Sequence, residues 1–294
     1  MSDLNMQPQS SDSVFIRFWQ RIPILIRAIV SGFLVYFVVG FVAWLAIVAL
    51  IPAPWSLVIM AVVLGIYLKY FSGSWWPKTT AATRSEYFRA TKLSAGVWKW
   101  SLITALLVVA VIQSSLVITF RVIEFPADAW ALGFDYKSIP IWLVWLYIVL
   151  MASVAGITEE VGFRGYMQVP LEKRYGPAAG IAIVSIMFMV LHLNQAWAPI
   201  VLIHLFVIGV LWGIMAYTSG SLIPGIISHT IADIFNFSYW WTNVAGKFDK
   251  LPIAETGIDS HFVIWLLIFV ASIALFVWAA RKTLLAHKSE TAPA

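Results

Sequence analysis

The chain has 294 residues, of which 61% are hydrophobic and only 11% are charged. A soluble globular domain carries about 45–50% apolar and about 25% charged residues, so this composition predicts an integral membrane protein and excludes a water-soluble enzyme. The chain has no cysteine, which excludes a thiol nucleophile, a cysteine-based zinc site and an iron–sulfur cluster. The net charge of +5 does not indicate nucleic-acid binding, because in a membrane protein the positions of the charges matter more than their sum.

Eight apolar stretches predict membrane-spanning helices, because a bilayer core takes about 20 mainly apolar residues. The fourth stretch can continue as one helix towards residue 170. We therefore expect an all-α, polytopic membrane helix bundle with about eight transmembrane helices. The stretches are 28–50, 55–71, 98–120, 141–158, 177–194, 198–217, 221–240 and 262–280.

The flanking segments predict a simple domain organisation. Residues 1–27 form a polar tail followed by an interfacial segment, whose run 14–27 mixes arginine with phenylalanine and tryptophan. The first 13 residues have the composition of a disordered segment. Residues 28–280 form the transmembrane domain, with its motifs in 141–240, and 281–294 form a cytoplasmic tail. The segment 72–96 is a loop between the second and third helices.

Lysine and arginine predict the orientation of the bundle. With the N-terminus in the cytoplasm, fifteen of the nineteen cations, Arg164 among them, fall in inside segments. Such a bias is typical of cytoplasmic segments, so both termini should be cytoplasmic and the protein should lie in the cell membrane. The outside loops hold Arg121, Lys137, Lys247 and Lys250.

Ionisable side chains within apolar helices are costly and are therefore functional candidates. All six of them lie between residues 159 and 233. They are Glu159, Glu160, His192, His204, His229 and Asp233.

The first cluster reads EEVGFR. On a helix, Glu160 and Arg164 are i and i+4 neighbours in the favourable order for an ion pair. Arg164 should then neutralise Glu160, and Glu159 should stay free to face a cavity. The alternative is a solvated, idle pair of acids at a helix end.

Two further clusters follow. Phe188 and His192 share a helix face, and so do His229 and Asp233, with Asn236 three residues on. A carboxylate one turn from an imidazole can fix its tautomer, although a helix-stabilising pair is the alternative. For His204 a packing role is favoured over lining the same cavity.

Gly209 and Gly213 form a GxxxG pair, which allows helices to approach closely.

Glutamate and histidine together can activate water as a general base, and two histidines with a carboxylate can hold Zn²⁺ with an open position. The sequence contains neither HExxH nor GxSxG, so a zincin-type site and that serine-hydrolase motif are excluded.

The clusters, in this order, resemble the CAAX protease and bacteriocin-processing (CPBP) family of intramembrane proteases, which includes the type II CAAX prenyl endopeptidases. The family motif EExxxR matches Glu159, Glu160 and Arg164; FxxxH matches Phe188 and His192; FxxG matches Phe206 and Gly209; and HxxxN/D matches His229 and Asp233. The resemblance covers roughly 141–240.

The resemblance implies an eight-helix membrane endopeptidase that opens to the cytoplasm. Glu159 would activate water with the help of His192, while His229 and residue 233 would stabilise the oxyanion or help to bind a metal. Zn²⁺ held by Glu159, His192 and His229 is one expectation, and a metal-free glutamate mechanism is the other. Asp233 departs from the commoner asparagine; an ionised Asp only accepts hydrogen bonds, so it would orient His229 or bind a cation.

The expected partners are a peptide or membrane-protein substrate and the lipid bilayer, with no nucleic acid. A non-catalytic bacteriocin-immunity or scaffold protein is the alternative function. A proton-coupled transporter is a third, which the lack of a visible inverted repeat weakens.

Straight-helix arithmetic raises one geometric problem. It places Glu159 about 27 Å from residue 141, near the cytoplasmic end of the fourth helix, while His192 lies far along the fifth. The two can meet if the fifth helix starts beyond the membrane plane, if the fourth is tilted, or if the fourth breaks near 153–156.

Overall fold

The computed structural model describes residues 14–89, 91–126, 139–193 and 199–291, and the regular structure of these residues is helical. The predicted disordered tail and Lys137 lie outside the described residues. In chain order the helices are α1 (Val14–Arg21), α2 (Ile24–Phe37), η1 (Val38–Ala43), α3 (Trp44–Leu50), α4 (Trp55–Phe71), η2 (Lys78–Thr80), α5 (Ala81–Phe88), α6 (Ala95–Val122), α8 (Ile141–Glu159), η4 (Glu160–Met167), α9 (Gln168–Tyr175), α10 (Pro177–Val190), α11 (Pro199–Ser219), α12 (Ile223–Phe235), η6 (Asn236–Trp241), α13 (Ile253–Thr256) and α14 (Ser260–Thr291).

The helices confirm the predicted all-α membrane bundle. Five of them are long and apolar enough to cross a bilayer, and α4 and α10 are shorter apolar helices. Each of the eight predicted stretches is helical over most of its length. The number of spans and the side on which the termini lie stay predictions.

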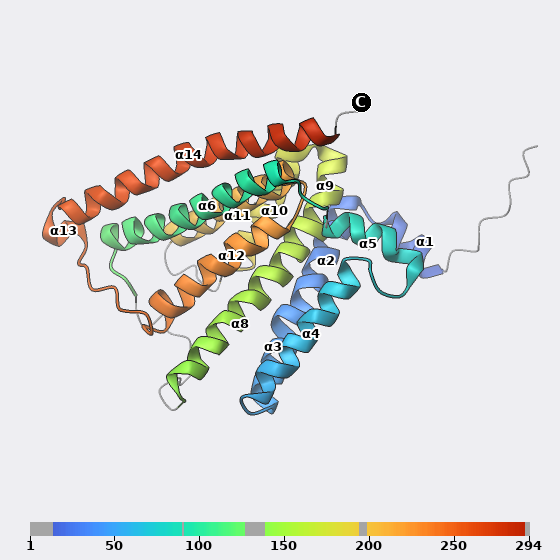
Figure 1. Cartoon of the computed structure of the whole chain (residues 1–294), viewed down its shortest axis with the longest axis horizontal. Helices are drawn as coiled ribbons and strands as arrows, with labels where there is room; N and C mark the ends of the chain where they lie inside the picture. Colours follow the sequence, from blue (N-terminus) through green and yellow to red (C-terminus); the bar gives the residue numbers. More distant parts are fainter. Residues whose placement is uncertain (1–13, 90, 127–138, 194–198, 292–294) are drawn as a thin grey trace, which may run out of the picture.

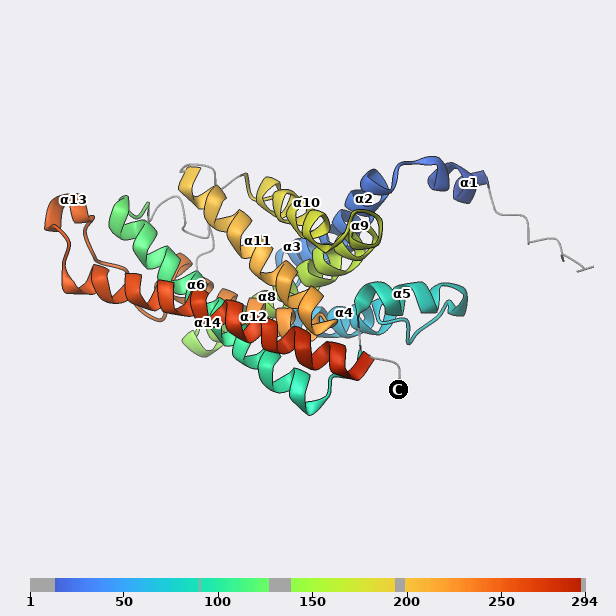
Figure 2. The ribbon, with the colours of Figure 1, turned by 90° about the horizontal axis from the view of Figure 1, so that it is seen from above.

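The bundle is built from two groups of helices (Figure 1, Figure 2). In one group α6 and α14 run side by side, and α11 packs against both. In the other, α8 packs against α12 while η4 packs against α2. The largest cluster of buried apolar side chains joins the two groups around Trp212 and Phe188.

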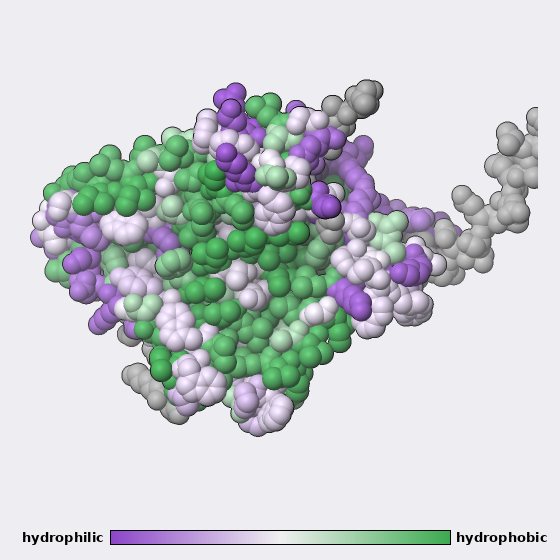
Figure 3. All heavy atoms as spheres, in the orientation of Figure 1, coloured by the Kyte–Doolittle hydropathy of each residue, from purple (hydrophilic) through white to green (hydrophobic). Residues whose placement is uncertain are grey.

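Polar residues gather at two opposite ends of the molecule, with an apolar band between them (Figure 3). One end, which we call the basic end, carries α1, α5, α9 and the last turns of α14. The other, the far end, carries α13 and the loop with Asp249 and Lys250. This pattern fits a molecule whose apolar band lies in a bilayer.

Glu159 and His192 can meet because the helix that carries Glu159 is longer than expected. The helical path from Ile141 continues without interruption through Glu159 to Tyr175. Glu159 therefore lies 17 residues before the turn at Gly176, and His192 lies 16 residues after it. At about 1.5 Å per residue the two have similar depths. The alternative of a break near 153–156 is wrong, because α8 is regular there.

Two boundaries differ from the sequence-based expectation. The loop 72–96 contains α5, whose side chain Arg84 is buried and donates to the carbonyl oxygens of Trp75 and Pro77. The predicted C-terminal tail is helical, because α14 continues to Thr291. Residues of that extension, such as Thr283, are buried against α6, which supplies the packing that a free tail would lack.

Candidate active site

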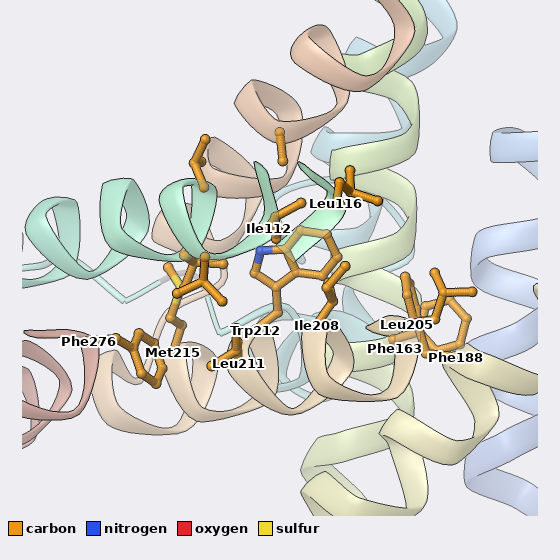
Figure 4. Close-up of a cluster of buried hydrophobic side chains, with 14 of the residues drawn as sticks. Ile112, Leu116, Phe163, Phe188, Leu205, Ile208, Leu211, Trp212, Met215 and Phe276 are labelled. Carbon is orange, nitrogen blue, oxygen red and sulfur yellow. The ribbon is translucent and has the colours of Figure 1, made fainter. Parts of the chain in front are cut away.

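A pocket of about 110 Å³ lies where α6, α8, α11, α12 and the turn after α10 meet. It has room for several water molecules. Trp212 and Ile208 project from α11 towards α6 (Figure 4) and form part of its wall. Its polar lining consists of Glu159, His192, His204, His229, Asp233 and Asn236.

The ion pair predicted for Glu160 and Arg164 is confirmed. The Glu160 Oε1 atom lies 3.0 Å from the Arg164 Nη1 atom, and neither side chain is exposed to solvent. Both residues belong to the π-helix η4, a rare conformation that occurs mostly at functional sites. Burying a carboxylate without a neighbouring cation would cost several kcal/mol. The ion pair with Arg164 therefore stabilises the buried Glu160 side chain.

Aromatic rings and one carbonyl hold the Arg164 guanidinium in place. Its Cζ atom lies 4.8 Å from the centre of the Phe188 ring and 5.3 Å from that of Trp212. Its Nη2 atom also donates to the carbonyl oxygen of Gly209, at 3.3 Å. Arg164 is therefore fully buried, although its position in the sequence puts it among the cations of the predicted inside segments.

Glu159 faces the pocket, as expected from its register. It ends α8, and its side chain keeps 11% of its surface exposed. The Oε2 atom has no hydrogen-bond partner and lies 3.8 Å from the His229 Nε2 atom, which is too long for a hydrogen bond. Because the rest of this side chain lines a pocket with room for water, its carboxylate is suited to hold a water molecule.

His229 is surrounded by carboxylates. Its Nδ1 atom lies 3.1 Å from Glu160 Oε1, and its Nε2 atom lies 3.5 Å from Asp233 Oδ2. Because a carboxylate accepts, the Nδ1–H group donates to Glu160. The ring also stacks on Trp212, with centroids 3.9 Å apart and planes at 15°, so its orientation is fixed from three sides.

His192 follows the last turn of α10. Its Nδ1 atom lies 2.7 Å from the carbonyl oxygen of Phe188. Only a protonated nitrogen can make that hydrogen bond, so in a neutral ring the Nε2 atom is an acceptor. The pocket thus combines the Glu159 carboxylate with a histidine acceptor that comes from the turn after α10.

Gln113 of α6 hydrogen-bonds the pocket residue Asn236. It was not predicted from the sequence, because only ionisable residues were considered there. The indole of Trp240 donates to its Oε1 atom at 3.0 Å, and its Nε2 atom donates to Asn236 Oδ1 at 3.0 Å. An indole can only donate, so this chain fixes the direction of both amides. The Asn236 amide in turn hydrogen-bonds the Asp233 carboxylate. A lone amide in an apolar helix was the signal for Gln113.

The remaining predicted residues have structural surroundings. His204 lines the pocket and its Nδ1 atom lies 2.9 Å from the Ser115 hydroxyl, so it combines both predicted roles. Phe206 is half-buried and is not part of the pocket lining. Gly209 and Gly213 let α11 approach α10 closely: a Cβ atom at Gly209 would lie 3.0 Å from Ser185, and one at Gly213 would lie 2.9 Å from Ile181.

The expected zinc ligands do not form a metal cluster. In the part of the chain that the structure describes, no three histidine, aspartate or glutamate side chains are grouped so that they could hold a metal ion. His229 already uses Nδ1 for Glu160. The side chains as arranged do not fit Zn²⁺, and we derive no chemical step through a metal.

The pocket lies towards the far end of the bundle. Its lining residues His204, Asn236 and Trp241 lie near the far-end termini of their helices, whereas α1 and the last turns of α14 are at the basic end. Cytoplasmic termini and a site that opens to the cytoplasm both stay predictions.

The comparison with known families agrees with the motifs. Residues 140–235, about a third of the chain, match the family model described as Type II CAAX prenyl endopeptidase Rce1-like. The matched segment begins just before α8 and ends with α12, so it contains Glu159, His192, His229 and Asp233. No curated protein and no solved structure matches the chain. Residues 140–235 of this multi-pass membrane protein are therefore similar to the type II CAAX prenyl endopeptidases.

Proposed function

We propose that the protein is an intramembrane endopeptidase of the cell membrane in which Glu159 activates a water molecule. The observation that carries the proposal is the Glu159 carboxylate, which lines a pocket shared with His192 and His229 and stays partly exposed. The family match supports peptidase chemistry in general, and the arrangement of side chains supports this division of roles.

The reaction follows from the positions of the donors and acceptors. Glu159 takes one proton from the water, His192 Nε2 accepts a hydrogen bond from its second hydrogen, and the water oxygen attacks the carbonyl carbon of the peptide. Because the His229 Nδ1–H group already donates to Glu160, the ring acts here in its doubly protonated form. Its Nε2–H group donates to the developing oxyanion, and Asp233 orients the ring. The C–N bond then breaks, and the protonated Glu159 gives its proton to the leaving nitrogen.

A cleavage assay in detergent tests the proposal. The matched family concerns prenyl endopeptidases, so the first substrates are quenched fluorescent peptides with a prenylated cysteine near the C-terminus, each beside its unmodified counterpart. General-base catalysis contributes about 10²- to 10⁴-fold. We expect Glu159→Gln to lower the cleavage rate by at least about 100-fold, while Glu124→Gln, at an exposed position outside the pocket, leaves it unchanged.

Cleavage that persists in the Glu159 variant contradicts the proposal. Wild-type protein that binds such peptides without cleaving any of a diverse set favours the alternative of a non-catalytic binding protein.

Metal removal is a separate test. Because the described carboxylates and imidazoles are not grouped as a metal cluster, we expect wild-type cleavage to survive prolonged dialysis against a chelator. Loss of activity that Zn²⁺ restores would instead support the metal-assisted mechanism.

A further inference from the structure

The active site is connected to a buried aromatic cluster near the end of η6. Trp240 is 3% exposed, and its ring centroid lies 5.3 Å from that of Phe120 and 5.1 Å from that of Phe248. Aromatic rings that are packed closely on one another have few alternative orientations. The indole N–H group of Trp240 therefore points in a fixed direction, and it donates to Gln113 Oε1 of α6 at 3.0 Å.

The direction of this first hydrogen bond determines the direction of those that follow. Because an indole only donates, Gln113 Oε1 is occupied as an acceptor, and Gln113 Nε2 donates to Asn236 Oδ1 at 3.0 Å. Since its oxygen is occupied in this way, Asn236 has its amide nitrogen left to donate to the Asp233 carboxylate. We call this chain the amide relay; it runs from Trp240 through Gln113 and Asn236 to Asp233.

The amide relay ends beside His229, where two carboxylates face one nitrogen atom. The His229 Nε2 atom lies 3.5 Å from Asp233 Oδ2 and 3.8 Å from Glu159 Oε2. The other ring nitrogen is already occupied by Glu160. The Asn236 amide holds Asp233 in place as the nearer acceptor. Without that hydrogen bond, Glu159 could take the Nε2–H group instead, and a carboxylate that pairs with a cationic imidazole is a weaker base towards water.

Gln113 acts on this arrangement only through other residues. It is not part of the pocket lining, whereas Asn236 and Asp233 are. It joins α6 to the helical segment that follows His229, 123 residues further along the chain. In metal enzymes, groups that orient a functional histidine through its hydrogen-bond partner typically contribute about 10- to 100-fold to activity. The same geometric argument applies to a histidine that binds an oxyanion.

We propose that Gln113 is a positioning residue of this active site. Through Asn236 it keeps Asp233 beside the Nε2 atom of His229, and it thereby leaves the Glu159 carboxylate available for water. The amide relay rests on the hydrogen bonds between these side chains, whereas its effect on cleavage rests on the proposed function.

Nitrogen NMR of the histidine rings tests the amide relay without any substrate. The full chain is isotope-labelled in its five histidines and reconstituted in lipid bilayers, and the His229 signals are assigned from a His229→Gln variant. The test variant is Gln113→Met, which keeps the length of the side chain but removes both hydrogen bonds. The matched control is Ser114→Ala, which removes a buried hydroxyl that donates to the carbonyl oxygen of Ala110 in the same helix.

We expect Gln113→Met to move the Nε2 signal of His229, because Asp233 is no longer held beside that atom, and Ser114→Ala to leave the signal in place. Trp240→Phe keeps a packed ring but loses the indole N–H group, so it should move the same signal by a smaller amount. A signal that stays at its wild-type position in Gln113→Met, or in Trp240→Phe if only that variant folds, overturns the amide relay.

Cleavage kinetics test the effect on the reaction. For Gln113→Met we expect kcat to fall about 10- to 100-fold while KM stays within about twofold of the wild-type value, because Gln113 does not contact the substrate. Ser114→Ala should leave both constants unchanged. A moved His229 signal with an unchanged kcat overturns the positioning role. Wild-type protein that cleaves no peptide overturns that role together with the proposed function, and the NMR comparison still decides on the amide relay.

Discussion

Glu159 and Glu160 are neighbours in the sequence but lie in two different regions of the molecule. Glu160 is fully buried and contacts both Arg164 and His229. Glu159 lines the pocket, and 11% of its side-chain surface stays exposed. One carboxylate is neutralised by the fold, and the other is left available for chemistry.

The helix itself produces this separation. Successive residues on a helix are about 100° apart, so the two adjacent acids point in different directions: Glu160 reaches Arg164 and the Nδ1 side of His229, and Glu159 reaches the pocket and the Nε2 side of that ring. The regular α-helix α8 ends at Glu159, and the wider turns of the π-helix η4 begin at Glu160. Stability and reactivity are thus assigned to different side chains within a single turn.

Removing the buried Arg164 guanidinium should have the largest effect on stability. Arg164→Leu leaves the fully buried Glu160 carboxylate without its arginine partner. Breaking a buried pair in this way costs about 3–5 kcal/mol, so we expect a strongly lowered melting temperature in detergent. The double variant Arg164→Leu with Glu160→Leu should recover part of that loss; no recovery would contradict the account of the ion pair.

Removing the amide of Gln113 should have a smaller effect. Gln113→Leu leaves the Trp240 indole and Asn236 Oδ1 unpaired, and a buried unsatisfied group costs about 1–3 kcal/mol. The measurement is a double-mutant cycle of melting temperatures with Asn236→Leu, in which the two losses should not add. Additive losses would show that the two amides are not coupled.

The smallest effect concerns an ion pair at the far end. A hydrogen bond from the Arg121 guanidinium lowers the pKa of Asp259 to about 2. The pKa is lower in the folded than in the unfolded state, so the stabilisation is complete above about pH 4 and is lost as the pH falls through about 2. The gap in melting temperature between wild type and Asp259→Asn should close over that range. A gap that is independent of pH would contradict the pairing.

Much of the fold could be predicted from the sequence because apolar helices of this length have a strong signal. The eight stretches, the ion pair of Glu160 with Arg164, and the close approach at Gly209 all follow from spacing along a helix. Local periodicity settles such contacts, because each depends on positions a few residues apart.

Other features depend on contacts between distant segments and could not be predicted. The extension of α8 through η4 and α9 to Tyr175 sets the depth of Glu159, and it is stabilised by packing against α2 and α10. The amide of Gln113 acquires its role only because α6 lies beside η6, 123 residues further along the chain. The complete burial of Arg164 depends on the assembled bundle in the same way, because residues of α10 and α11 surround its guanidinium.

The difference between the two adjacent glutamates can be measured directly by recording cleavage rate and melting temperature together for Glu159→Gln and Glu160→Gln. The account predicts that Glu159→Gln loses at least about 100-fold in rate while its melting temperature stays within a few degrees of the wild-type value. Glu160→Gln should instead lower the melting temperature, because Arg164 loses its buried counter-ion. A Glu159→Gln protein that cleaves at the wild-type rate, with its fold intact, would contradict the assignment of Glu159 as the group that activates water.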